Sequence, residues 1–219
     1  MQTILLATGN AKKGHELQQL CAERFSVRTL KEVLNHDVNV VEDAADFAGN
    51  AAKKARVVAE LVIKRGLSEI DIVIADDSGL VVDALDGNPG VRSARFSADA
   101  GYAPPGLSVD DANNRLLLLM MAPVPPPQRT ARFISAVIAR VINGGAEVSA
   151  QGSVEGLIAP DLLGDGGFGY DPLFVVQDGP TQLRGRRMAE LSSSEKHGLS
   201  HRGRAMRALL AQLSHAATL

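Results

Sequence analysis

Short apolar runs and helical patterns alternate along this chain, and together they predict its main elements. Residues 2–7, which are rich in Ile and Leu, have the pattern of a buried strand. In residues 46–65 the apolar side chains recur at helical spacing, so a helix is expected there. Further strands are expected at residues 25–30, 38–41, 71–75, 80–85 and 173–176, and further helices at 11–24, 109–121 and 200–213. This mixture predicts an α/β fold.

The second half of the chain contains two long strand patterns and a proline-rich segment. Residues 130–142 and 146–158 predict a hairpin, because Asn143-Gly144-Gly145 between them is a turn sequence. Residues 122–128 contain four prolines, a composition typical of a stiff extended linker. We therefore expect residues 1–219 to form a single domain of two lobes, with the internal linker in this segment.

Composition and charge narrow the class of protein. The chain has 219 residues, of which 45% are hydrophobic, so it can bury a sizeable core. Its formal net charge of −2 argues against binding of nucleic acid by bulk electrostatic attraction. The single cysteine, Cys21, excludes an intrachain disulfide and a thiolate zinc site, and no apolar run is long enough to span a bilayer. We expect a cytoplasmic protein without nucleic-acid or membrane partners.

Two adjacent acids are the strongest candidates for metal chemistry. Asp76 and Asp77 follow the predicted strand 71–75, and neighbouring side chains on a strand point to opposite faces. One carboxylate can therefore face a cleft while the other braces the backbone, and hard carboxylate oxygens suit Mg²⁺. Glu42 ends another extended stretch and is a further possible ligand. The structural alternative is an Asp-rich turn closed by Gly79.

The first strand–helix junction offers groups that suit a phosphate. Thr8-Gly9-Asn10-Ala11-Lys12-Lys13 combines a tight turn, exposed helix amides and a lysine charge. Asn50 and Lys54 lie one turn apart on the predicted helix 46–65, where they could face the same phosphates. The structural alternatives are an ordinary strand–helix turn and a surface lysine.

A glycine-rich loop and the start of the last helix offer groups that suit a base. In the loop Gly166-Gly167-Phe168-Gly169-Tyr170-Asp171-Pro172, glycine lets the backbone approach a ligand and an aromatic ring can stack on a base. Ser200-His201-Arg202-Gly203 opens a helix, and Ser200 alone can be explained as its N-cap. The structural alternative for the loop is a turn with two aromatic core anchors. The five histidines do not share metal-ligand spacing.

Seven short motifs occur in one order along the chain. They are Thr8-Gly9-Asn10-x-x-Lys13, Asn50-Ala51-x-x-Lys54-Ala55, Asp76-Asp77-Ser78-Gly79-Leu80, Pro89-Gly90-x-x-Ser93-Ala94-Arg95, Gly167-Phe168-Gly169-Tyr170-Asp171-Pro172, Glu195-Lys196 and Ser200-His201-Arg202-Gly203. With these motifs the chain closely resembles the inosine/xanthosine triphosphate pyrophosphatase family, the house-cleaning enzymes of non-standard purine nucleotides. The matches run from residue 8 to residue 203 and so cover nearly the whole chain.

The resemblance implies a fold and a reaction. The fold would be a two-lobed α/β structure with a long mixed central sheet, flanking helices and a nucleotide cleft between the lobes, usually as a homodimer. The reaction would be Mg²⁺-dependent attack of water on the α-phosphorus of a purine nucleoside triphosphate, namely that of inosine, deoxyinosine or xanthosine. The products would be a nucleoside monophosphate and pyrophosphate.

The resemblance also implies roles for individual residues. The triphosphate would be bound by Thr8, Gly9, Asn10, Ala11, Lys12, Lys13 and Lys54, and the nucleoside by Ser78, Phe168, Gly169, Tyr170, Asp171, Lys196, His201 and Arg202. Glu42 and Asp77 would hold Mg²⁺, with Asp77 also the base that activates water. Ala44, Asp46 and Gly49 depart from the family pattern, so Asp43 or Asp46 is an alternative ligand. Residues 99–107 look like a surface insertion near the lobe junction.

Two other functions compete with this one. A Mg²⁺-dependent phosphatase with an aspartyl nucleophile typically has Asp-x-Asp, whereas Asp76 and Asp77 are adjacent. A non-catalytic regulator that binds purine nucleotides would have the phosphate and base motifs without needing the acid pair. The acid pair favours the pyrophosphatase.

Overall fold

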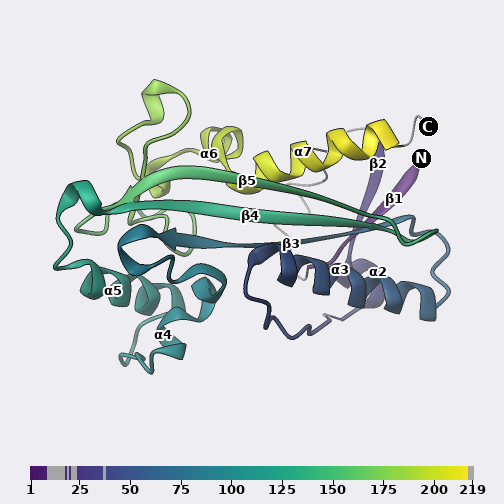
Figure 1. Cartoon of the computed structure of the whole chain (residues 1–219), viewed down its shortest axis with the longest axis horizontal. Helices are drawn as coiled ribbons and strands as arrows, with labels where there is room; N and C mark the ends of the chain where they lie inside the picture. The colour runs from purple at the N-terminus through teal and green to yellow at the C-terminus, as the bar shows by residue number, and fades with distance from the viewer. Residues whose placement is uncertain (9–17, 19, 21–23, 37, 217–219) are drawn as a thin grey trace. The chain divides into compact units, whose positions relative to one another are not determined.

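The computed structural model describes residues 1–8, 18, 20, 24–36 and 38–216. Its strands form one mixed sheet in the order β2-β1-β3-β4-β5-β6 (Figure 1). They are β1 (Gln2–Leu6), β2 (Phe25–Thr29), β3 (Ile72–Val82), β4 (Thr130–Val141), β5 (Glu147–Ile158) and β6 (Phe174–Val176). Strand β1 is parallel to β2 and to β3, whereas β5 and β6 are antiparallel to each other. The predicted α/β class with a mixed sheet is confirmed.

Helices flank this sheet. They are α2 (Leu30–Leu34), α3 (Phe47–Lys64), α4 (Phe96–Asp99), α5 (Val109–Met121), α6 (Ser193–Leu199) and α7 (His201–Ala216). Short 3₁₀ turns are η1 (Asp83–Leu85), η2 (Gly90–Arg95), η3 (Pro126–Gln128), η4 (Thr181–Leu183) and η5 (Met188–Glu190). The predicted helices 46–65, 109–121 and 200–213 are α3, α5 and α7, whereas the predicted helix 11–24 lies almost entirely outside the described residues. Within the described ranges, no helix has both the length and the apolar character needed to cross a membrane.

The chain divides into two compact units, each with its own core. Unit 1 comprises Met1–Asp77, Ser135–Gly152 and Arg204–Leu219, and unit 2 comprises Ser78–Ile134 and Ser153–Gly203. The chain passes from one unit to the other within β3, β4, β5 and α7. The proline-rich segment 122–128, predicted as an internal linker, lies inside unit 2.

A buried arginine explains why this segment belongs to unit 2. Arg129 is 6% exposed, and its guanidinium donates to the carbonyls of Met121 at 2.6 Å and Val124 at 3.2 Å. It also donates to the carbonyls of Ile158 at 2.7 Å and Ala159 at 3.0 Å. One side chain therefore ties the end of α5 and the turn after it to the end of β5.

In unit 1, helices cover both faces of the sheet, with α7 on one side and α2 and α3 on the other (Figure 1). On one face Ile4, Leu6, Ile72, Ile74, Val137 and Ala139 pack with α7 residues Ala205, Met206, Leu209 and Leu213. On the other face Leu5, Val73, Ala75 and Ile138 pack with α2 and α3 residues Leu30, Leu34, Ala51, Ala55, Val58 and Val62. The strands are continuously apolar because both faces of the sheet are covered.

Strand β3 continues through the two adjacent acids, which corrects the predicted break after residue 75. The predicted strands 71–75 and 80–85 form one element, Ile72–Val82. Its second half is held by Ser93, whose Oγ accepts from the Leu80 amide at 2.9 Å. Acids are tolerated inside this strand because their polar groups have partners, as the Asp77 carboxylate shows below.

The predicted strand at residues 38–41 is wrong, since this segment has no regular structure. Val41 is 72% exposed, which is incompatible with a buried strand. A few residues later, the Ala44 amide donates to Asn50 Oδ1 at 3.0 Å, so the chain is bound to a side chain of α3 instead of a neighbouring strand. The segment therefore leads into α3 without joining the sheet.

Candidate active site

The first candidate group lies in unit 1, between α3 and β3. We call Glu42, Asn50, Lys54 and Asp77 the acid–lysine cluster. Lys54 Nζ lies 2.8 Å from Glu42 Oε1 and 3.1 Å from Asp77 Oδ1. Asn50 Nδ2 donates to the second oxygen of Asp77 at 3.1 Å. Asn50 is fully buried and Asp77 is 9% exposed, whereas the Glu42 side chain is 31% exposed. One ammonium therefore pairs with two carboxylates, and the cluster keeps one net negative charge.

Strand geometry places the two adjacent acids on opposite faces. Asp77 follows Val73 and Ala75 at alternate positions of β3, and it therefore points to the side of α3. Asp76 follows Ile74, whose side chain packs with α7. The Asp76 carbonyl still contributes to the first face, because it accepts from Lys54 Nζ at 3.3 Å. This orientation of the acids agrees with the expectation from sequence.

The charges in the cluster shift the pKa values of its members. Burial raises the pKa of Asp77, although the Lys54 ammonium and the Asn50 amide oppose the rise. Burial disfavours the charged form of Lys54, but the carboxylates of Glu42 and Asp77 outweigh it and raise the Lys54 pKa. Lys54 therefore keeps its charge, and the Asp77 carboxylate is a stronger proton acceptor than an exposed aspartate.

Of the predicted ligand Glu42 and its two alternatives, Asp43 and Asp46, Glu42 is the acid whose carboxylate lies beside Lys54. Asp43 is paired with Lys53, and Asp46 accepts from the Gly49 amide at 2.7 Å as the N-cap of α3. A Cβ at position 49 would lie 2.7 Å from Ala44 Cβ, so glycine suits this tight cap. The three departures from the family pattern therefore form a helix start.

A depression of about 270 Å³ opens beside the acid–lysine cluster. Thr8, Asn39, Glu42, Lys54 and Asp76 are among its lining residues. Pockets that enclose a whole drug-sized ligand measure roughly 300–1,000 Å³, so this space suits a part of a ligand such as phosphate groups. Thr8 thus lies with Lys54 as expected, whereas the predicted phosphate-binding residues Gly9, Asn10, Ala11, Lys12 and Lys13 lie outside the described residues.

The donor atoms of this cluster fit a hard divalent cation. Glu42 and Asp77 already converge on one positive charge, that of Lys54. In the described part of the chain, no group of three or more His, Cys, Asp and Glu residues is arranged to hold a metal ion by itself. Mg²⁺ commonly binds one or two carboxylates and completes its shell with water and substrate phosphates. Two converging carboxylates beside a phosphate-sized depression match that requirement.

The second candidate group lies in unit 2. We call Phe168, Asp171, Lys196 and Arg202 the aromatic–cation cluster. The Phe168 side chain is 54% exposed, and Lys196 Nζ and Arg202 Cζ lie 4.8 Å and 5.8 Å from the centre of its ring. Arg202 Nη2 also donates to Ser78 Oγ at 3.3 Å. An exposed ring flanked by two hydrogen-bond donors is a surface on which a base can stack.

Neighbouring residues hold this cluster in place. Asp171 is 4% exposed; its Oδ2 accepts from the Phe168 amide at 2.9 Å and forms an ion pair with Lys196. His201 stacks on Phe133, with ring centroids 5.1 Å apart. Ser200 Oγ accepts from the Gly203 amide at 3.2 Å, so Ser200 caps the start of α7 as the sequence suggested.

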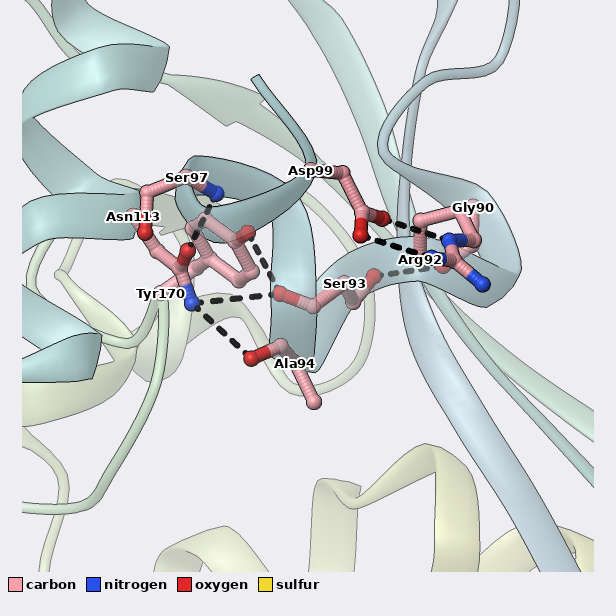
Figure 2. Close-up of polar contacts among 8 residues, drawn as sticks. All are labelled: Gly90, Arg92, Ser93, Ala94, Ser97, Asp99, Asn113 and Tyr170. Carbon is pink, nitrogen blue, oxygen red and sulfur yellow. Dashed lines mark hydrogen bonds and ion pairs between the residues drawn. The ribbon is translucent and has the colours of Figure 1, made fainter. Parts of the chain in front are cut away.

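Tyr170 is a core anchor in this structure. It is 4% exposed, and its hydroxyl donates to the Ser93 carbonyl at 2.8 Å (Figure 2). Burial raises the pKa of the phenol, so the hydroxyl stays protonated and available as this donor. The Asn113 amide donates to the same carbonyl at 3.3 Å and accepts from the Ser97 amide at 2.8 Å (Figure 2). The side chain of Tyr170 is therefore occupied within unit 2.

Similarity to known proteins extends over nearly the whole chain. The sequence model of the Ham1 family matches residues 4–212. The chain belongs to the Ham1 family. A dITP/XTP pyrophosphatase of Corynebacterium efficiens is 41% identical to this Ham1 chain over 219 residues, covering 98% of each. That of Clostridium perfringens is 38% identical over 210 residues, covering 95% of this chain and 96% of the relative. The family resemblance inferred from the motifs is confirmed.

Solved structures of related proteins agree with the fold. The Ham1 protein of Staphylococcus aureus superposes with a TM-score of 0.80 at 31% identity, covering 98% of this chain and all of that one (100%). A dITP/XTP pyrophosphatase of Mycobacterium abscessus superposes with a TM-score of 0.71 at 40% identity, covering 95% of this chain and 99% of that one. Both likenesses extend over the two units.

Sequence reasoning missed several polar residues that organise unit 2 of this Ham1 chain. Asn113 and Asn114 are 2% and 3% exposed on α5, next to the buried Leu117 and Met121. A signal for them was present, because a polar residue on the apolar face of an amphipathic helix needs a buried partner. Arg129 carried no comparable signal, since two of its four carbonyl partners, Ile158 and Ala159, belong to a segment distant in sequence.

Proposed function

We propose that this Ham1 chain is a pyrophosphatase that hydrolyses inosine, deoxyinosine and xanthosine triphosphates to the monophosphate and pyrophosphate, and so removes them from the nucleotide pool. The names of the relatives support this substrate class. The observation that carries the proposal is the acid–lysine cluster, where one ammonium lies within 3.1 Å of two carboxylates and the Asp77 carboxylate is largely buried. Such a cluster combines a phosphate-binding charge with a base.

Residues of the acid–lysine cluster supply what this hydrolysis requires. Lys54 binds a phosphate oxygen, and Thr8 to Lys13 add hydrogen bonds and charge. Asp77, held by Asn50, orients the attacking water and takes its proton. The water oxygen bonds to the α-phosphorus, and the bond to the bridging oxygen breaks, so that pyrophosphate leaves with the electron pair. Mg²⁺ held by Glu42 and Asp77 would neutralise the negative charge of the phosphates.

The aromatic–cation cluster accounts for selection of the base. Phe168 stacks on any purine, whereas Lys196 and Arg202 can only donate hydrogen bonds and a suitable His201 tautomer also donates. A 6-oxo group accepts these bonds, but the 6-amino group of adenine places donors against donors. Each unmet bond costs roughly 1–3 kcal/mol, so two or three give a discrimination on the order of 10³-fold in kcat/KM. Ser78, Gly169, Tyr170 and Asp171 would complete the nucleoside contacts.

The proposal includes a setting and an assembly. The single cysteine of the sequence suits the reducing cytoplasm. The resemblance to the pyrophosphatase family implies a homodimer with a purine nucleoside triphosphate as its substrate. Light scattering coupled to size-exclusion chromatography measures the molar mass of the protein in solution. A monomer at micromolar concentration would contradict the proposed dimer but not the proposed reaction.

The decisive experiment measures the products formed from inosine triphosphate with Mg²⁺. We expect inosine monophosphate and pyrophosphate in equal amounts, with orthophosphate appearing once an inorganic pyrophosphatase is added. Adenosine triphosphate is the matched substrate control. Stoichiometric orthophosphate and inosine diphosphate without the added enzyme would indicate a phosphatase, and tight binding without turnover would indicate the nucleotide-binding regulator.

A further inference from the structure

Both backbone polar groups of Gly169, its amide and its carbonyl, are hydrogen-bonded to side chains of α5. Asp110 Oδ2 accepts from the Gly169 amide at 2.9 Å, and Asn114 Nδ2 donates to the Gly169 carbonyl at 2.9 Å. Asp110 and Asn114 are four positions apart, so they lie one helical turn from each other on the same side of α5. Asn114 is 3% exposed, whereas Asp110 lies at the exposed helix start. We call these two residues the α5 clamp.

The α5 clamp acts on the residue next to the exposed aromatic ring. Gly169 has a φ of +59°, a conformation that glycine adopts more readily than other residues. Gly167, the residue that precedes Phe168, has a φ of +83°. A Cβ at this position would collide with Asp171 Oδ2, so glycine is required there. The Phe168 side chain is 54% exposed, so core packing contributes little to its orientation. Its direction then depends on Lys196 and Arg202 over the ring and on the bonds that fix the backbone of the neighbouring residues.

We propose that Asp110 and Asn114 are positioning residues that hold the Phe168 ring ready for the base of the nucleotide. This inference rests on the proposed function, because it assumes that a purine stacks on Phe168. Neither clamp residue needs to touch the substrate. A ring already held in the bound orientation loses less conformational freedom when the base arrives, so the clamp lowers KM and leaves the chemical step unchanged.

A purely structural role for Asp110 is the competing explanation. An acid in the first turn of a helix stabilises that helix through the macrodipole. Asp111 offers a matched control, since it occupies the same turn with the same charge and bonds to Ser108. The Asp111 carboxylate accepts from Ser108 Oγ at 2.7 Å, so its hydrogen bond serves the N-cap of α5 and not Gly169. Asp110→Ala and Asp111→Ala should therefore cost similar helix stability but differ at Phe168.

The first test does not require any activity. The chain contains no tryptophan and two tyrosines, so Phe168→Trp introduces a single indole at the exposed position, which can be excited at a longer wavelength than tyrosine absorbs. In this background we expect Asp110→Ala to lower the fluorescence anisotropy of the indole and to increase its quenching by acrylamide about two-fold, while Asp111→Ala changes neither. If Asn114→Ala folds, it should have the same effect as Asp110→Ala. If Asn114→Ala does not fold, the comparison of Asp110→Ala with Asp111→Ala decides the question. Equal anisotropy in all folded variants would overturn the clamp.

The second test separates binding from chemistry with inosine triphosphate as the substrate. We expect Asp110→Ala to raise KM about five-fold, the scale of one net hydrogen bond, with kcat changed by less than about two-fold. Asp110→Asn should restore most of the affinity, because its amide oxygen can still accept from Gly169. A fall in kcat at constant KM, or the same KM increase in Asp111→Ala, would overturn the proposal. Absence of turnover in the wild type would contradict the proposed function instead, and the anisotropy result would still decide whether the clamp exists.

Discussion

The acid–lysine cluster and the aromatic–cation cluster are built in different ways. In the first, Asn50 and Lys54 come from α3 and Asp77 comes from β3, so their directions follow from regular elements packed against each other. In the second, Phe168 lies in an irregular glycine-rich loop bonded by Asp171 and by side chains of α5. From this difference we expect substitutions in the acid–lysine cluster to remove activity from an intact scaffold, and substitutions in the aromatic–cation cluster to change binding and local order.

The sharpest test of this comparison is Asp77→Asn. We expect turnover of inosine triphosphate to fall by about 10²–10⁴-fold, because asparagine cannot accept the proton of the attacking water. Packing should survive, since the amide is nearly isosteric with the carboxylate. Asp76→Asn is the matched control, because its side chain leaves β3 on the opposite face, and it should change stability more than turnover. Steady-state kinetics and urea unfolding of both variants measure the two effects, and exchanged phenotypes would show that the assignment of strand faces is wrong.

Unit 2 depends on side chains that bond to backbone carbonyls, and Arg129→Met tests this dependence. Four carbonyls lose their donor, so the free energy of unfolding should fall by about 3 kcal/mol. Arg132→Met is the control, because Arg132 makes surface ion pairs with Asp83 and Glu155, and such exposed pairs contribute about 0–1 kcal/mol. The urea midpoints of the two variants give the comparison. Similar losses of unfolding free energy in both variants would mean that the buried hydrogen bonds of Arg129 contribute no more to stability than the surface ion pairs of Arg132.

The aromatic–cation cluster should affect selectivity more than stability. We expect Arg202→Ala to reduce the ratio of kcat/KM for inosine triphosphate over adenosine triphosphate by about 10-fold or more, because one donor to the 6-oxo group is lost. Arg207→Ala removes an exposed charge from the same helix and should leave the ratio unchanged. Competition kinetics with both substrates measure the ratio. Equal selectivity in wild type and Arg202→Ala would refute the donor mechanism.

The smallest effect is expected at an ion-pair network on the surface of unit 1. Glu147 bonds to Arg56 at 2.7 Å and to Arg140 at 2.7 Å. Hydrogen bonds from Arg56 lead the effects that lower the Glu147 pKa from 4.5 to about 2. Because the folded-state pKa lies below the unfolded one, the network stabilises the protein above pH 4.5 and loses this contribution as the pH falls toward 2.

Glu147→Gln should therefore lower the free energy of unfolding at pH 7 by about 1 kcal/mol or less, since solvent screens a partly exposed pair. The difference from wild type should shrink between pH 4.5 and pH 2, the range between the two pKa values. Urea unfolding at several pH values in this range measures the difference. A difference that stays constant with pH would show that the charge of Glu147 does not contribute.

Strongly periodic segments were predicted well from sequence. Helix α5 spans Val109–Met121 as expected, because its cap Ser108 and its apolar spacing are local signals. The short helix α2 was missed, although Thr29 and Glu32 form a capping box that the sequence displays. The break expected in β3 was wrong for a different reason. Polar residues were taken to end the strand, whereas the buried partners of Asp77 let the strand continue.

The candidate site shows the same division between local and distant information. Glu42, Lys54 and Asp77 were chosen from motifs, and the structure brings these three together. The bonds from Asp110 and Asn114 to Gly169 join residues 59 and 55 positions apart, so no local pattern could predict them. Arg129 likewise reaches carbonyls 29 and 30 positions away.

The sequence by itself determined the elements with clear periodicity, the family and the chemical types of the candidate residues, since each of these depends on neighbouring residues or on short motifs. The tertiary structure alone decided that the carboxylate of Asp77 pairs with Lys54, because this depends on which face of β3 packs against α3. It also decided that Tyr170 is a core anchor while Phe168 is exposed. The physical reason is that burial and pairing of polar groups are set by contacts between distant segments, which form once the cores of the units are packed.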